Sequence, residues 1–191
     1  MAAFKLPNGK ISLARIGIDG RMYTTDGSLN SWGAWVDRGN AGSAPLTQIT
    51  GLSRDASNAE FACVAADGKV YHRTWNTASG WTNWAQINAN VMGAGRRVAL
   101  VSRSSSTLNA VIVGTDRKVY HASKSAGAAW SAWSAVSGLT AAYNAQVGAV
   151  VRNSTTVEVF VSGSSGNNRV YSNSWASNGT WRGWTQLPSN L

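Results

Sequence analysis

Apolar and polar residues alternate along four short runs of the chain, at 12–17, 60–65, 109–114 and 158–163. Similar runs precede the last three, at 49–54, 98–103 and 147–152, and residues 4–6 form a weaker version before the first. Such alternation is typical of β-strands with one buried face. No helical periodicity separates the runs, so the chain is predicted to be all-β.

A turn and a tyrosine follow each alternating run. The turns contain Asp19-Gly20, Asp67-Gly68 and Asp116-Arg117, and the fourth is the longer Gly166-Asn167-Asn168. Asp-Gly between apolar runs is a strong signal for a tight hairpin. After each turn come a basic residue, a hydrophobic residue and then the tyrosine, at Tyr23, Tyr71, Tyr120 and Tyr171. Each alternating run is therefore predicted to pair with the strand that carries the tyrosine.

The motif Trp-x-x-Trp occurs once after each tyrosine and sets the length of an internal repeat. Successive pairs are 49, 49 and 51 residues apart, and they are Trp32/Trp35, Trp81/Trp84, Trp130/Trp133 and Trp181/Trp184. Four strands per copy, in four copies without helices, are typical of β-propeller blades. Solenoid repeats are usually shorter, and a sandwich has no reason to repeat its aromatic positions.

We therefore predict a single β-propeller domain over residues 1–191, built from four antiparallel four-stranded blades. The predicted blades are approximately 1–42, 43–91, 92–140 and 141–191. Four blades lie at the small end of the propeller range. An unclosed propeller exposes strand edges, so a ring completed by a second copy of the chain is an alternative to closure within one chain.

Composition agrees with short strands and many turns, because charged residues make up only 13% of the chain and Pro occurs three times. Cys63 is the single cysteine and lies in an alternating run, which excludes an internal disulfide and indicates a buried side chain. No segment is apolar enough for a membrane helix or a signal peptide. We expect a soluble protein, either cytoplasmic or secreted by another route.

The net charge of +9 favours acidic partners, but its distribution weakens that interpretation. Arg54, Arg103 and Arg152 recur at intervals of 49 residues, and basic residues also precede each repeat tyrosine. The positive charge is thus spread over the copies and does not gather in one run. Nucleic acid is not favoured as a partner, and an anionic polysaccharide bound through these basic residues is kept as an alternative.

The tryptophans are the main candidates for a binding surface. The two members of each pair are an odd number of residues apart, so on one strand they point to opposite faces. Packing explains the second member best, and the first member (Trp32, Trp81, Trp130 or Trp181) is a candidate platform for a sugar ring. Copies two and four carry a further tryptophan, Trp75 and Trp175, where copies one and three have Gly27 and Lys124. Because the repeat does not require them, Trp75 and Trp175 are the aromatic residues that packing explains least.

Polar partners for sugar hydroxyls are predicted near these tryptophans. His72 and His121 follow the repeat tyrosine in copies two and three, and Tyr71 and Tyr171 complete the candidate set. Two histidines without a recurring carboxylate or thiol do not predict a metal site, and no cofactor is expected. Glycosidases need paired carboxylates, which are scarce here, and 24–27 before Trp32 does not have the spacing of a sialidase turn. The chain is therefore predicted not to be an enzyme.

The order Asp-Gly, basic, hydrophobic, Tyr-His and then Trp-x-x-Trp resembles the fucose-binding β-propeller lectins of insect-associated bacteria. The stretches that carry the resemblance are Asp67-Gly68-Lys69-Val70-Tyr71-His72 with Trp81-Thr82-Asn83-Trp84, and Val119-Tyr120-His121 with Trp130-Ser131-Ala132-Trp133. The resemblance implies binding of fucose or related sugars between adjacent blades, although those lectins have seven blades. We expect a multivalent lectin for fucose-like or other neutral sugars on glycans, with homo-oligomers as a further expectation. A structural or protein-interaction propeller is the alternative.

Overall fold

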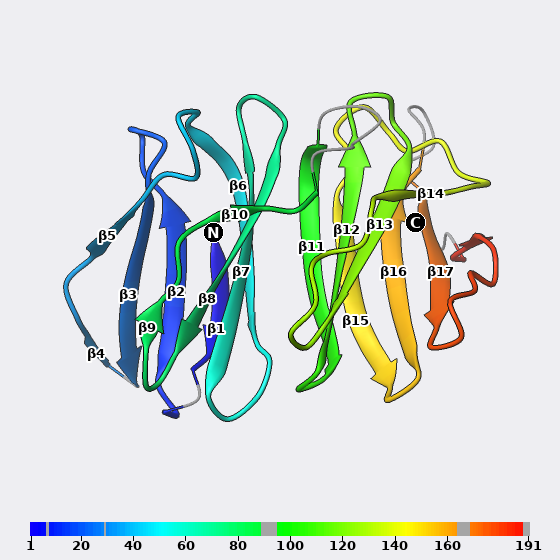
Figure 1. Cartoon of the computed structure of the whole chain (residues 1–191). Helices are drawn as coiled ribbons and strands as arrows, with labels where there is room; N and C mark the ends of the chain where they lie inside the picture. The colour runs from blue at the N-terminus through cyan, green and yellow to red at the C-terminus, as the bar shows by residue number, and fades with distance from the viewer. Residues whose placement is uncertain (7, 29, 89–94, 164–168, 189–191) are drawn as a thin grey trace. The chain divides into compact units, whose positions relative to one another are not determined.

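The computed structural model describes residues 1–6, 8–28, 30–88, 95–163 and 169–188, and the regular elements among them are all β-strands. The strands form four antiparallel sheets, each built from one predicted copy of the repeat (Figure 1). The all-β prediction and the prediction of four propeller-type blades are confirmed. The predicted turn at 166–168 lies outside the described residues.

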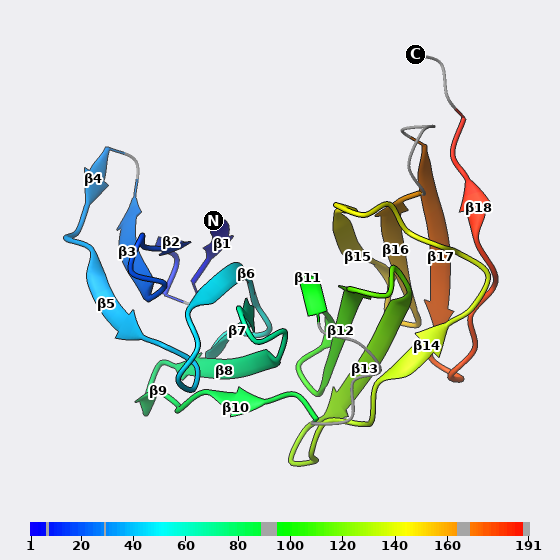
Figure 2. The same cartoon turned by 90° about the horizontal axis from the view of Figure 1, so that it is seen from above.

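The chain divides into two compact units, Met1–Ala89 and Asn90–Leu191, each with two sheets. A single domain over the whole chain therefore stays a prediction. The strands of the first unit are β1 (Ala2–Lys5), β2 (Ile11–Ile16), β3 (Met22–Ser28), β4 (Ser31–Trp32), β5 (Val36–Gly39), β6 (Leu46–Ser53), β7 (Asn58–Ala65), β8 (Val70–Asn76), β9 (Gly80–Trp81) and β10 (Ala85–Gln86). In the first sheet β2 pairs with β1 and β3, and β3 also pairs with β4 and β5 (Figure 2). In the second sheet β7 pairs with β6 and β8, and β8 also pairs with β9 and β10.

The second unit repeats the same plan with fewer short strands. Its two sheets have the orders β11-β12-β13-β14 and β15-β16-β17-β18. The strands are β11 (Gly95–Ser104), β12 (Thr107–Gly114), β13 (Val119–Ser125), β14 (Ser134–Val136), β15 (Val147–Asn153), β16 (Thr156–Ser162), β17 (Val170–Ala176) and β18 (Thr185–Gln186). The alternating runs of the sequence thus form the first two strands of each sheet.

In the first two sheets the outermost strand is interrupted between the two tryptophans of the motif. Trp81 ends β9, whereas Trp84 lies in the irregular segment before β10. Both side chains pack against the same core cluster of the first unit, and Trp181 and Trp184 do the same in the second. The prediction that the two tryptophans point to opposite faces is wrong for these copies, because side-chain alternation holds only along a continuous strand.

Each sheet has two faces that are named here by their residues. The Trp face carries the first tryptophan of the motif and its cross-strand partner, such as Trp81 and Trp75 in the second sheet. The back face carries the residue that directly follows the repeat tyrosine, such as Thr24 in the first sheet. In each unit the Trp face of the later sheet packs against the back face of the earlier sheet, which produces one shared core per unit.

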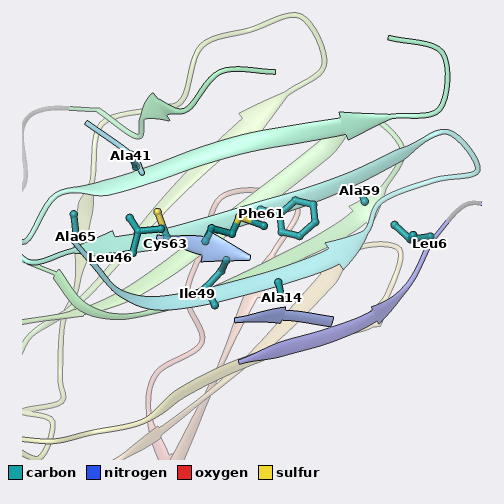
Figure 3. Packing of buried hydrophobic residues seen from close by; sticks show 10 residues of the cluster. Leu6, Ala14, Ala41, Leu46, Ile49, Ala59, Phe61, Cys63 and Ala65 are labelled. Atoms are coloured by element: carbon teal, nitrogen blue, oxygen red, sulfur yellow. The ribbon is translucent and has the colours of Figure 1, made fainter. Parts of the chain in front are cut away.

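Figure 3 shows the core of the first unit, to which both sheets contribute. Ala14 and Met22 come from the first sheet, and Ile49, Phe61 and Cys63 come from the second. Phe61 is fully buried, and its ring lies 5.0 Å from that of Phe4, centroid to centroid, in an edge-on arrangement. Burial raises the pKa of the Cys63 thiol to about 12, so this side chain is a neutral part of the core.

The predicted Asp-Gly turns position the start of the next sheet. Gly20 has a φ of +74°, and its carbonyl accepts a hydrogen bond from the Leu46 amide at 2.8 Å. Arg117 occupies the equivalent position of the third copy with a φ of +65°. A Cβ atom added at Gly20 would lie 2.4 Å from Cβ of Pro45, so close packing as well as backbone conformation requires glycine here.

Replacing Gly20 by Ala is expected to lower the free energy of unfolding by about 3 kcal/mol, because left-handed backbone strain and a clash with Pro45 add up. Gly39→Ala is the matched control, since Gly39 has a φ of +79° but no atom within 4 Å of its added Cβ. It should cost only about 1 kcal/mol. Urea unfolding followed by circular dichroism measures both; equal losses would show that contact with Pro45 contributes nothing.

Candidate functional site

The extra tryptophans of copies two and four each form a cross-strand pair with the first tryptophan of the motif. Trp75 pairs with Trp81, and Trp175 pairs with Trp181 through an isolated bridge. The rings of Trp175 and Trp181 are 5.1 Å apart, centroid to centroid, and inclined by 46°. All four side chains are half-buried and pack against the core between the two sheets of their unit. Two equivalent junctions therefore each present a pair of partly exposed indole rings.

Copy one has no such pair. Gly27 is the cross-strand partner of Trp32, and a Cβ atom at Gly27 would lie 2.7 Å from the indole ring. The Trp32 ring therefore lies directly over the backbone of Gly27, and it is 45% exposed. In copy three the corresponding residue is Lys124, which is half-buried, as is Trp130. Trp32 and Trp130 are thus first tryptophans of the motif that lack a tryptophan as cross-strand partner.

In the second unit a histidine from the earlier sheet lies against the tryptophan pair. The His121 ring is 4.4 Å from Trp175 and 5.4 Å from Trp181, centroid to centroid. Its Nε2 lies 3.1 Å from Oδ1 of Asn109. Burial, with a smaller effect of the nearby Arg103, lowers the pKa of His121 to about 4. A neutral imidazole therefore overlies this pair at neutral pH.

In the first unit two arginines take the place of the histidine. The guanidinium carbon of Arg38, at the end of β5, is 4.9 Å from the Trp81 ring centroid, and that of Arg73, on β8, is 4.5 Å from it. Arg73 also lies 5.1 Å from the ring of Trp84. Guanidinium groups at these distances are attracted to the negative face of an indole ring. The two junctions thus share a tryptophan pair and differ in the groups that overlie it.

The other predicted sugar ligands occupy different surroundings. His72 is buried on the back face of the second sheet, where its Nε2 lies 2.7 Å from Oε2 of Glu60. The same carboxylate accepts a hydrogen bond from Thr74 at 2.8 Å and forms an ion pair with Arg54 at 3.0 Å. His72 and Trp75 therefore do not share a face, and contact of His72 with a sugar stays a prediction.

Tyr71 and Tyr171 are half-buried in their sheets. The Tyr71 side chain packs against the core of the first unit, with its hydroxyl beside Gly42. The Tyr171 hydroxyl donates a hydrogen bond of 3.5 Å to Gln186. Sugar contact for both tyrosines stays a prediction.

Arg38 and Arg73 were not predicted from the sequence, although a signal for them exists. Three residues after the second tryptophan of the motif, copies two to four have Ile87, Val136 and Leu187, whereas copy one has Arg38. Arg73 likewise aligns with Thr25, Ala122 and Asn173. Each arginine thus differs from the residues at the same position of the other copies. The same kind of difference made Trp75 and Trp175 candidates.

The described residues contain no group of three or more histidine, cysteine, aspartate or glutamate side chains placed to hold a metal ion. That same part of the chain has no helix with the length and apolar character needed to cross a membrane. Two glutamates of the strands are hydrogen-bonded within their sheets: Glu60 as described above, and Glu158 as acceptor of a 2.6 Å hydrogen bond from Ser174.

The sequence matches no protein-family model and no curated protein. Solved structures with the same fold include a lectin from Burkholderia pseudomallei, with a TM-score of 0.78 and 15% identity over 98% of this chain and 55% of that one. The fucose-specific lectin from Aleuria aurantia has a TM-score of 0.66 and 15% identity over 98% of this chain and 60% of that one. The fold is thus that of the fucose-binding β-propeller lectins, and the chain spans little more than half of these structures.

A sialidase, NanB from Streptococcus pneumoniae, also has a similar fold. Its TM-score is 0.66, with 13% identity over 90% of this chain and 29% of that one. At such identity the likeness concerns the fold, and fold does not determine activity. That the chain is not an enzyme stays a prediction.

The low pKa of His121 predicts a pH dependence of stability. Below pH 6.5 the unfolded chain binds a proton at this position, whereas the folded chain does not until about pH 4. Acidification across this window therefore favours the unfolded state, by up to about 3 kcal/mol. Urea unfolding at several pH values, compared with His121→Phe, isolates the effect, because carboxylates titrate in both proteins. If the difference in unfolding free energy between the wild type and His121→Phe did not change with pH, the effect could not be assigned to His121.

Proposed function

We propose that this protein is a carbohydrate-binding lectin whose sites are the two tryptophan pairs. The observation that carries the proposal is that a partly exposed Trp–Trp pair recurs at equivalent junctions of both units. These pairs include Trp75 and Trp175, and copies one and three have Gly27 and Lys124 at the same position of the repeat. Packing alone does not require Trp75 or Trp175, since copies one and three form their sheets without them.

The chemistry of the junctions suits a sugar. A pyranose has an apolar C–H face that stacks on an indole ring, and its hydroxyls need donors and acceptors at the rim. In the second unit Asn173, two residues before Trp175 on the same strand, accepts a hydrogen bond from the Gly183 amide at 3.0 Å, and its Nδ2 is buried without a hydrogen-bond partner among the described residues. We take Trp75 and Trp175 as the stacking residues, with Trp81 and Trp181 supporting them.

Fucose or another neutral sugar is the ligand we propose for the second unit. The likeness in fold to the fucose-specific lectin from Aleuria aurantia supports this class, as does the neutral imidazole over the pair. Two sites on one chain allow multivalent attachment to glycans, which raises weak individual affinities.

We further propose that copies of the chain associate through their first and fourth sheets. The Trp face of the first sheet has no earlier sheet in its unit, and Trp32 and Trp35 are 45% and 40% exposed. The back face of the fourth sheet has no later sheet in its unit, and Val150 and Val170 are 51% and 39% exposed there. Within each unit these two kinds of face cover one another, so the Trp face of the first sheet and the back face of the fourth fit a head-to-tail contact between copies.

Substituting both Trp75 and Trp175 by Ala is expected to abolish binding of fucosylated glycans while the sheets remain folded. Because fucose is proposed for the second unit, Trp175→Ala alone should remove the fucoside site, whereas Trp75→Ala should leave its stoichiometry and affinity unchanged. Isothermal titration with methyl α-L-fucoside gives the stoichiometry and the affinity of each variant. Unchanged stoichiometry in both single variants would refute the assignment; no binding by the wild-type chain to any glycan would favour a protein-interaction scaffold.

The association of copies is tested by Val150→Glu, which places a charge in the proposed contact. Light scattering coupled to size-exclusion chromatography should show a multiple of the chain mass for the wild type and the mass of one chain for the variant, because burying an unpaired charge is costly. Ser154→Glu, in the exposed turn after β15, is the control and should leave the assembly intact. A wild-type chain that is monomeric at all concentrations would contradict the proposal.

A further inference from the structure

The two junctions carry the same tryptophan pair, but charged groups overlie the pair in the first unit and a neutral group overlies it in the second. In the first unit the guanidinium groups of Arg38 and Arg73 overlie Trp81. At the aligned positions of the second unit stand Val136 and Asn173, and the group over the pair is the neutral imidazole of His121. The repeat therefore provides its own comparison between a charged and an uncharged version of one site.

Arg73 is a buried cation. The residue is 8% exposed, and its Nη1 donates a hydrogen bond of 2.9 Å to the backbone carbonyl of Arg38. Its Nε is buried and has no hydrogen-bond partner among the described residues. Burial and the neighbouring Arg38 lower the pKa of Arg73 to about 10, which still leaves it charged at neutral pH. A buried charge of this kind is costly unless an opposite charge compensates it.

The surroundings do not supply a paired anion. Arg38 donates through Nε to the hydroxyl of Thr24 at 2.9 Å. Among the described residues, neither arginine has a carboxylate oxygen within 4.0 Å. Asp26 acts on Arg38 from a greater distance and accepts a hydrogen bond from Ser12 at 2.7 Å. The Cys63 thiol is neutral and adds no negative charge. The guanidinium groups of Arg38 and Arg73 therefore face the single negative charge of Asp26, and the junction keeps a net positive charge.

We propose that the junction of the first unit binds a sugar that carries a carboxylate, with Arg38 and Arg73 holding the carboxylate and Trp75 stacking on the ring. The planar guanidinium fork matches a carboxylate in geometry as well as in charge. This inference rests on the proposed lectin function and deepens it: one chain would combine a site for an acidic sugar with a site for a neutral one.

The test compares methyl β-D-glucuronide with methyl β-D-glucoside, which differ by a carboxylate in place of a hydroxymethyl group. At pH 7 and about 150 mM salt the wild-type chain should bind the glucuronide about tenfold more tightly, the gain typical of charge-assisted hydrogen bonds. Ligand-observed NMR titration measures both affinities. The double variant Arg38→Val and Arg73→Asn, which copies the residues of the second unit, should lose this preference while still binding the glucoside.

Nonspecific attraction to a basic protein is the competing explanation. The double variant Lys10→Gln and Lys118→Gln removes the same charge from exposed positions and should keep the full preference. Loss of the preference in this control, or its survival in the arginine variant, overturns the proposal. If the arginine variant does not fold, Arg38→Val alone leaves the buried Arg73 in place and should reduce the preference severalfold.

Failure of this inference is distinguishable from failure of the lectin proposal. Equal affinity of the wild-type chain for glucuronide and glucoside rejects the acidic site and leaves the lectin function standing. Binding of neither glycoside, nor of methyl α-L-fucoside, rejects the lectin function itself. Binding of glucose 6-sulfate without binding of the glucuronide would also overturn the proposal, because the site would then respond to charge without the carboxylate geometry.

Discussion

Coverage of the Trp face by the back face of the preceding sheet is the interaction on which each unit depends. A lone four-stranded sheet of this repeat would expose indole rings on one side and small apolar side chains on the other. Stacking two sheets places Phe61 and Cys63 of one against Ala14 and Met22 of the other and removes both surfaces from water. The Trp face of the first sheet has no such cover within its unit, and the tryptophans of copy one remain exposed.

Because the junction is also the candidate site, its residues divide into two groups with different freedom to vary. The apolar positions of the inner strands are buried in the core of each unit, as in Phe61 and Cys63 of the first and Val157, Val159 and Val161 of the second. The outermost strand carries Arg38 in one unit and the buried Val136 at the aligned position of the other, and both sheets are antiparallel with their strands in chain order. Binding properties can therefore diverge between copies while the scaffold stays the same.

The fold was largely predictable from the sequence, because alternation recurs in each copy and the Asp-Gly or Asp-Arg turns of the first three copies act locally. The packing of the motif was not: the strand breaks after Trp81, and no local pattern indicates that Trp84 then returns to the same core. Trp75 and Trp175 were singled out by their departure from the repeat, and the structure places each against the core between the two sheets of its unit. Arg38 and Arg73 show the same departure, but their role depends on two sheets meeting, which the spacing along one chain does not reveal. His72 and His121 occupy the same position of the repeat, yet His72 lies beside Glu60 and His121 beside Asn109. Their environments therefore differ because the neighbouring strand carries a different residue.

Cys63 gives the first unit a chemical label that the second unit lacks. It is the single thiol of the chain, it is fully buried, and its raised pKa keeps it in the unreactive protonated form. A thiol reagent can therefore react with Cys63 only when the two sheets of the first unit separate. The rate of that reaction measures how often they separate. Comparison of that rate with the unfolding of the whole chain measures whether the two halves of the molecule come apart together or independently.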